Sequence, residues 1–125
     1  MVYAGIVLKK NKRILFQFRD NNKRTRNLGT WGIFGGGVKK NEDPKQAVIR
    51  EIKEELGVTL HKKDVKLLVE TNFRGELVFI FESDFSYILS NLKLREGSDS
   101  RFFSKREILK LKNTVPGLKK FVGEL

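Results

Sequence analysis

The sequence predicts one domain of the α/β (α+β) class, and three observations lead to this prediction. The chain has 125 residues, which is enough for one hydrophobic core and too few for two domains of ordinary size. Short β-rich runs lie near the N-terminus and in the middle of the chain, and segments with helix start and stop signals lie between and after them. With 39% hydrophobic residues and only two prolines, the chain carries enough apolar surface to fold.

The first part of the chain predicts three strands and a long loop. Residues 2–8 form a β-rich run, and residues 13–19 alternate in polarity, which predicts two strands joined by a basic turn. Residues 20–30 are too polar for a core element and too long for a tight hairpin, so we expect an exposed, mobile, basic loop. Residues 31–34 predict a short strand that runs straight into the three glycines at 35–37.

The clearest element is a helix that starts at Pro44 and carries an apolar and charged pattern over residues 46–56. Asp43 is a favourable N-cap, and Pro44 suits the first helical position. An apolar and charged pattern with helical spacing follows, and Gly57 ends it as a C-terminal cap. We therefore expect an amphipathic helix of about three turns at this position.

The second half of the chain predicts further strands and two short helices. The strand predictions are residues 65–70, 76–81 and 87–94, with turns near 72–75 and 83–86. Ser104 and Glu107 have the spacing of a capping box, which predicts a helix over residues 105–111, and Pro116 predicts the start of a last helix that reaches residue 121.

Composition narrows the kinds of site that the chain can hold. It has no cysteine and one histidine, His61, which excludes disulfides, thiolate nucleophiles, cysteine zinc sites and histidine-clustered metal sites. Any metal must therefore be held by oxygen. No apolar run is long enough to cross a bilayer, and residues 1–8 lack the features of a signal peptide, so we expect a soluble, cytoplasmic protein that does not bind membranes.

The formal net charge is +11, from 26 Lys and Arg against 15 Asp and Glu. Such a surface attracts anions, which favours a phosphorylated partner such as a nucleotide or a nucleic acid. Lysine-rich surfaces also serve solubility or thermal stability, and the charge alone does not decide between these readings.

Three glutamates of the predicted helix lie close together. At about 100° per residue, Glu51, Glu54 and Glu55 share a face about 100° wide, beside the apolar face of the helix. Like charges at this spacing repel one another, so a cation should compensate them. A divalent ion that prefers oxygen, such as Mg²⁺ or Mn²⁺, is the natural candidate.

Residues around these glutamates suit the same site. Gly36 lacks a Cβ, which lets a backbone carbonyl or amide approach a metal or phosphate closely. Arg50 can fix carboxylate rotamers through bidentate hydrogen bonds. Glu42 precedes the helix, where an acidic side chain also favours the helix dipole.

Residues 36–58 resemble the 23-residue Nudix box, Gly-x5-Glu-x7-Arg-Glu-U-x-Glu-Glu-x-Gly-U, in which U is aliphatic. All seven fixed residues and both aliphatic positions are filled, which makes the match highly specific. A Trp-x-x-x-Gly-Gly lead-in starts at Trp31, and the stretch at residues 96–104 before the second capped helix is also similar to many members of this family.

The resemblance implies a mixed β-sheet sandwiched between helices. It also implies Mg²⁺-dependent hydrolysis of a nucleoside diphosphate linked to another group X, in which Mn²⁺ can substitute. Transferred to this sequence, the family pattern implies that Glu51, Glu54 and Glu55 are metal ligands. It also implies that one of them, or a later glutamate, activates the attacking water. A backbone carbonyl of Gly35 or Gly36 is then a further metal ligand. Arg50 and Glu42 support the orientation of the glutamates.

Five further residues each have a functional and a structural interpretation. Glu96 is either the late glutamate that many relatives use or an exposed turn residue, and Gln17 and Arg19 either contact base or phosphate or face solvent. Phe34 stands where many relatives have proline, and its ring either supplies an aromatic surface to the substrate or packs in the core. Trp31 either stacks on a base or belongs to the core.

Three functions remain open at this stage. The first is a hydrolase of small nucleotides, acting on ordinary or modified triphosphates, nucleotide sugars or dinucleotides. The second is the same chemistry at RNA 5′ ends, which the net charge favours. The third is a non-catalytic nucleotide-binding module. The sequence does not give the group X, the general base, or whether the protein is a monomer or a homodimer.

Overall fold

The structure is a computed structural model, and it describes residues 2–18, 29–87, 99–114 and 117–123. In these residues the elements are β1 Val2–Lys10, β2 Arg13–Phe18, β3 Trp31–Gly32, β4 Phe34–Gly37, α1 Pro44–Leu56, the 3₁₀ turn η1 Lys62–Asp64, β5 Lys66–Phe73, β6 Glu76–Asp84, β7 Asp99–Ser104, α2 Lys105–Lys110 and α3 Leu118–Gly123.

The strands of the described residues form one mixed sheet around β1. Strand β1 pairs in parallel with β6 along its length, and it pairs antiparallel with β4 through its first half and with β2 at its end. Strand β5 lies outside β6, while β3 and β7 both pair with β2. The mixed pairing confirms the predicted α+β class.

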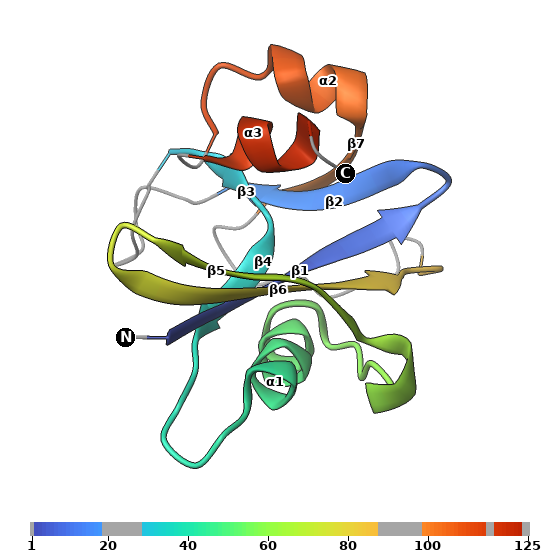
Figure 1. Cartoon of the computed structure of the whole chain (residues 1–125). Helices are drawn as coiled ribbons and strands as arrows, with labels where there is room; N and C mark the ends of the chain where they lie inside the picture. Colours follow the sequence, from blue (N-terminus) through green and yellow to red (C-terminus); the bar gives the residue numbers. More distant parts are fainter. Residues whose placement is uncertain (1, 19–28, 88–98, 115–116, 124–125) are drawn as a thin grey trace.

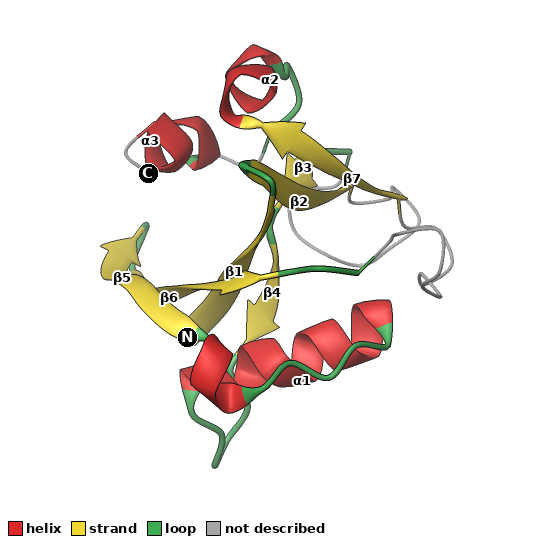
Figure 2. Cartoon of the chain, turned by 90° about the vertical axis from the view of Figure 1, so that its right-hand side faces the viewer, coloured by secondary structure: helices red, strands yellow, loops and turns green. Residues whose placement is uncertain are grey.

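Helices cover both sides of this sheet. Helix α1 lies along one side, and α2 and α3 lie on the other (Figure 1). The view at 90° shows the same arrangement, with α1 below the strands and the two short helices above them (Figure 2). This agrees with the sandwich that the Nudix resemblance implies.

Each side of the sheet has its own hydrophobic core, because alternate residues of a strand point to opposite faces. The core on the α1 side joins the apolar face of α1 to buried residues of β1, β2 and β6, among them Leu15 and Phe81. The core on the other side joins Phe16, Trp31 and Phe103 to the two short helices. Strand β2 is therefore buried on both faces, although its alternating sequence suggested one exposed face.

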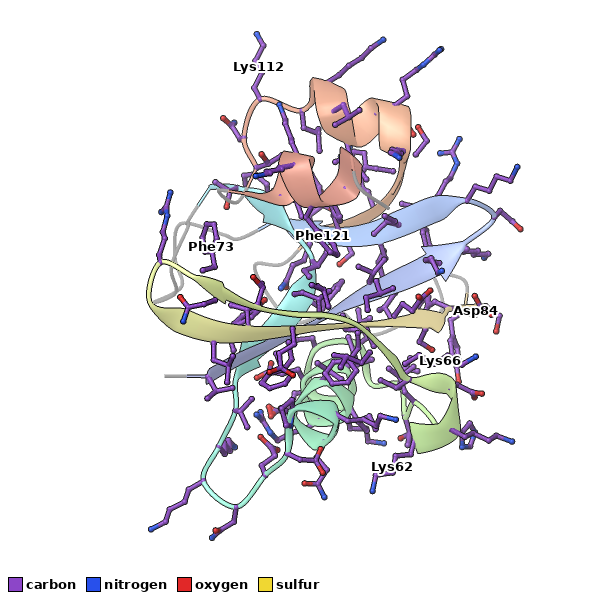
Figure 3. The ribbon with its side chains drawn as sticks, viewed as in Figure 1. Lys62, Lys66, Phe73, Asp84, Lys112 and Phe121 are labelled. Carbon is purple, nitrogen blue, oxygen red and sulfur yellow. The ribbon has the colours of Figure 1, made fainter. Side chains whose placement is uncertain are left out.

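The end of the β5–β6 hairpin lies close to the residue that precedes α3. Phe73 lies so close to Gly117 that a Cβ on this glycine would be 3.0 Å from the ring. Figure 3 shows Phe73 on the same side of the sheet as Phe121, which lies in α3 and packs against this core. The tip of the hairpin therefore approaches the chain just before the C-terminal helix.

Two helices confirm the capping signals in the sequence. The Asp43 side chain accepts from the Gln46 backbone N–H at 2.8 Å, and Gly57 ends α1 in the left-handed conformation at φ 71°. The Ser104 hydroxyl accepts from the Glu107 backbone N–H at 3.2 Å, which starts α2 as predicted. These caps satisfy N–H groups that the first turn of a helix leaves without partners.

Several predicted boundaries are wrong. Strand β6 continues to Asp84, where a turn was predicted, because its parallel pairing with β1 extends that far. Residues 31–34 form parts of two strands, β3 and β4, and the glycines at 35–37 are part of β4. Strand β7 was not predicted, because its sequence Asp-Ser-Arg-Phe-Phe-Ser is polar at its start.

Other predictions fall partly or wholly on residues that the structure does not describe. The last helix begins at Leu118 rather than at Pro116, and Pro116 is outside the described residues. Residues 88–94 of the strand predicted at 87–94 and most of the predicted loop at 20–30 are outside them as well, and Tyr87 is not in a strand. In the part of the chain that is described, no helix is both long enough and apolar enough to cross a membrane.

Candidate functional site

Helix α1 holds Glu51 against Gly36 of β4. Gly36 pairs with Ala4 in the sheet, and a Cβ on Gly36 would lie 2.4 Å from Glu51 Oε1. Glu51 therefore reaches the sheet only because residue 36 has no side chain. Gly35 is also tightly packed, since a Cβ there would lie 2.4 Å from the Ala4 carbonyl oxygen. The glycine run thus brings carboxylate and backbone oxygens together.

Arg50 lies at the centre of a hydrogen-bonded network. Its Nε and Nη2 donate to the two carboxylate oxygens of Glu42, at 2.8 and 3.0 Å. Its Nη1 donates to Glu54 Oε1 at 2.9 Å and to Glu51 Oε1 at 3.1 Å. Its Nη2 also donates to the Gly37 carbonyl at 3.2 Å. One guanidinium therefore links the loop before α1, the end of β4 and two of the box glutamates.

Glu42 is held as a carboxylate by this network. The hydrogen bonds from Arg50, helped by the Lys39 backbone N–H at 3.0 Å, lower the pKa of Glu42 to about 2. In turn, the Glu42 carboxylate raises the pKa of Arg50 above its ordinary value. Both groups remain charged at neutral pH, so their bidentate pairing persists there.

Glu51 has the opposite electrostatic environment. Burial raises the pKa of Glu51, the Arg50 charge lowers it in part, and the charges of Glu54 and Glu55 raise it further. Its side chain is 18% exposed, against 39% for Glu54. Burial is therefore the largest cause of the raised pKa, and a cation bound at this carboxylate would offset the cost of burying its charge.

The donor set fits a divalent cation that prefers oxygen. Glu51, Glu54 and Glu55 lie on one helix, and the Glu51 carboxylate lies against Gly36. Carboxylates and backbone carbonyls are ligands that Mg²⁺ and Mn²⁺ accept. Among the residues that the structure describes, no three Asp, Glu or His side chains converge as a ready metal cluster. Instead, Glu51 and Glu54 share Arg50 Nη1.

The side chain of Gln17 is buried, although polar residues of a strand usually face solvent. It is only 8% exposed and lies on the same face of β2 as Leu15, which packs in the core on the α1 side. Ser100 of β7 is paired opposite it and is 7% exposed. Among the described residues, the Ser100 hydroxyl has no hydrogen-bond partner. Sequence reasoning missed Ser100, because its burial depends on a strand that was not predicted.

Two aromatic candidates are part of the cores. Phe34 is 1% exposed and packs on the α1 side, which favours its packing interpretation over a substrate contact. Trp31 makes edge contacts with Phe18 and Phe103, at ring distances of 5.2 and 5.0 Å, in the core opposite α1. His61 is exposed next to η1.

The remaining candidates lie outside the described residues. These are Arg19 and Glu96. Their predicted roles as a substrate contact and as the late glutamate stay predictions.

Comparisons with known proteins agree on one family. The sequence model of the NUDIX domain matches residues 1–125. A protein of Mycobacterium tuberculosis named "Putative 8-oxo-dGTP diphosphatase 3" is 27% identical over 92 residues, or 66% of this chain. An RNA pyrophosphohydrolase of Hydrogenovibrio crunogenus is 51% identical over 41 residues, or 33% of this chain. The chain covers only 41% of the first relative and 24% of the second.

The fold is also similar to solved structures. The crystal structure of a MutT protein from Methanosarcina mazei Go1 superposes with a TM-score of 0.74 at 25% sequence identity. The superposition covers 99% of this chain and 91% of that protein. The likeness therefore extends over the whole sandwich rather than over the glycine run and α1 alone.

Proposed function

The chain belongs to the Nudix family, and from this premise we propose that it hydrolyses the diphosphate linkage of a nucleoside diphosphate joined to another group X. The family generally uses divalent metal cations, and we propose Mg²⁺ for this chain, with Mn²⁺ as a substitute. The observation that carries the proposal is the placement of Glu51 against Gly36 while Arg50 holds Glu51 and Glu54.

The metal ligands in this proposal are the side chains of Glu51, Glu54 and Glu55, with a backbone carbonyl of Gly35 or Gly36. When bound, the cation neutralises the diphosphate and lowers the pKa of a water molecule. The raised pKa of Glu51 supports a binding role, because burial makes its charged form costly and a bound cation would offset that cost. Glu96 stays a further candidate ligand.

The protein's own groups supply positioning and proton transfer. Arg50 fixes the carboxylates through its hydrogen bonds, so that they need little reorganisation when the substrate arrives. Glu42 keeps Arg50 in place through two bonds. A carboxylate oxygen of Glu51, Glu54 or Glu55 accepts the proton of the attacking water.

Small nucleotides are the proposed substrates, and the mycobacterial relative's printed name supports a triphosphate. The test is release of phosphate or pyrophosphate, with Mg²⁺ or Mn²⁺, from nucleoside triphosphates, oxidised triphosphates, nucleotide sugars, dinucleoside polyphosphates and triphosphorylated RNA. We expect turnover of one class, lost by at least about a hundredfold in Glu54→Gln and Glu55→Gln. Glu70→Gln, an exposed residue of β5, is the matched control. Unchanged turnover in both site variants would contradict the proposal.

RNA 5′ ends are the alternative substrate. The net charge of +11 and the similarity to an RNA pyrophosphohydrolase over 41 residues favour it. Salt dependence separates the two readings, because RNA binding weakens with salt in proportion to the number of phosphates contacted, whereas a small nucleotide gives a shallower slope. A flat response would exclude extended RNA contacts.

A non-catalytic binding module is the third interpretation, and detectable Mg²⁺-dependent turnover would exclude it.

We propose that residues 1–125 act as one domain, which the match of the NUDIX domain over the same residues supports. Light scattering will distinguish a monomer from a homodimer. A cytoplasmic location stays a prediction.

A further inference from the structure

We propose that Ser100, together with Gln17, recognises the nucleobase of the substrate through hydrogen bonds. This inference rests on the proposed function, since it assigns the part of the site that reads the base. Three observations carry it: the pairing of the two residues, their burial, and the unpartnered hydroxyl of Ser100.

The two side chains lie next to each other on the side of the sheet that α1 covers. Gln17 and Ser100 are directly opposite in the antiparallel pairing of β2 with β7. The preceding pair on the same face, Leu15 and Phe102, belongs to the core that α1 completes. Because side chains alternate along a strand, Gln17 and Ser100 also point to this side.

Their distance from the glutamates suits a nucleotide. Gly32 is the other neighbour of Gln17 in the sheet, and Gly36 lies against Glu51. Gly32 and Gly36 are four residues apart, so the chain between them spans at most about 14 Å. A nucleoside diphosphate that binds at the glutamates through its diphosphate can therefore extend its base toward this pair.

The unpartnered hydroxyl needs an explanation. Buried polar groups in proteins almost always have a hydrogen-bond partner, because water is lost on burial and its hydrogen bonds must be replaced. Ser83 follows this rule, since its buried hydroxyl donates to the Asp84 carbonyl at 3.1 Å. Ser100 is similarly buried and has no such partner. A ligand that supplies one would account for this difference.

The chemistry of the pair matches a base better than a phosphate. A glutamine amide offers donors and an acceptor, and a serine hydroxyl offers both. These uncharged groups match the edge of a nucleobase, which presents neutral donors and acceptors. Phosphate oxygens are instead best bound by Arg and Lys. The neighbouring Leu15 and Phe102 are apolar, which suits a flat base and disfavours a charged group.

The test compares base selectivity between variants. We would measure kcat/KM for ATP, GTP, CTP and UTP, and for ribose 5-triphosphate, which has no base. In Ser100→Ala, the ratio between the best nucleotide and ribose 5-triphosphate should fall about tenfold, the value of one hydrogen bond. Ser100→Thr keeps the hydroxyl and should retain most of the ratio. Ser83→Ala is the control, and its ratio should not change.

Stability gives a second, independent readout. If the hydroxyl is kept for a ligand, Ser100→Ala removes an unsatisfied polar group and should leave the Tm of the free protein unchanged or raised. Ser83→Ala removes a hydroxyl that has a hydrogen-bond partner, so it should lower the Tm. An unchanged kcat/KM ratio between the best nucleotide and ribose 5-triphosphate in Ser100→Ala would overturn the inference while the hydrolase proposal stands. An equal loss of this ratio in Ser83→Ala would overturn it as well.

Binding separates this inference from the proposed function. If the wild type hydrolyses none of these substrates, calorimetry with AMP, GMP, CMP and UMP replaces the kinetic assay. Base-dependent binding that is lost in Ser100→Ala would support the inference although the hydrolase proposal had failed. Binding that does not depend on the base, or no binding at all, would overturn the inference.

Discussion

The two sides of the sheet are both buried, but by different means. On one side a single 13-residue helix packs its aliphatic face against the strands and carries the Arg50 network on its flank. On the other side two helices of six residues each cover an aromatic cluster of Phe16, Trp31 and Phe103. Figure 2 shows this asymmetry, with one long helix below the strands and two short ones above.

The difference also appears in the polar residues. In the described part of the chain the buried polar side chains are Gln17, Ser83 and Ser100. By strand alternation they all lie on the α1 side, since their neighbours two residues away, Leu15, Phe81 and Phe102, pack there. Polar groups are costly in a core and are retained where they have partners or functions. In the proposed function, the α1 side carries the reacting groups and the other side is a scaffold.

Loss of Arg50 should have the largest effect. Arg50→Met keeps the length of the side chain but leaves Glu42, Glu51 and Glu54 without their shared countercharge. Because the side chain is only 21% exposed, we expect a loss of about 3 kcal/mol in the free energy of unfolding. Activity should fall on the order of a hundredfold, because the carboxylates lose their common donor. Urea unfolding and kcat/KM measure the two effects.

Arg13→Met is the control for this change. Arg13 pairs with Glu107 at 3.5 Å on the surface, with both side chains about half exposed. Exposed pairs of this kind contribute little, so neither stability nor activity should change measurably. Similar losses in the two variants would show that the Arg50 network is no more than a surface ion pair.

Loss of Trp31 tests the scaffold side. Trp31→Ala removes edge contacts with Phe18 and Phe103, but its backbone N–H can still donate to the Asn113 carbonyl at 2.8 Å. The ring is partly buried, so we expect a loss of about 2 kcal/mol in stability. The base preference and KM of the folded enzyme should not change. A selective change in base preference would instead favour the interpretation in which Trp31 stacks on a base.

The sequence predicted the α1 side better than the scaffold side, and the reason is local. Helix α1 is set by residues within the helix and at its caps, such as Asp43 and Gly57, so its position can be read from a short window. The same window contains Glu42, Arg50 and the glutamates, so their proximity could also be predicted. The structure adds the close approach of Glu51 in the helix to Gly36 in the sheet.

The features that sequence reasoning missed depend on contacts between distant segments. Strand β7 forms because residues 99–104 pair with β2, far away in the sequence, and its own composition does not require a strand. Strand β6 reaches Asp84 because β1 provides a parallel partner as far as Lys9. The burial of Ser100 follows from the first of these pairings. No local pattern distinguishes it from an exposed serine.

The smallest expected effect concerns the two glycines at the end of β4. In Gly36→Ala the new Cβ would meet the Glu51 carboxylate, which is the far end of a flexible side chain and can turn away. Stability should therefore change little. A displaced carboxylate should still lower kcat/KM by about tenfold, or about 1.4 kcal/mol in the activation free energy. Thermal unfolding and kinetics with the best substrate test both parts.

Gly37→Ala is the matched control, because no atom lies within 4 Å of its new Cβ and its carbonyl can still accept from Arg50. It should resemble the wild type in both measurements. If the two alanine variants lost equal activity, the glycine run would matter for backbone freedom rather than for the room it gives Glu51. A loss confined to Gly36→Ala would instead localise the effect at the contact between the sheet and Glu51. That outcome would tie the chemistry of the α1 side to one close approach between a helix and a strand.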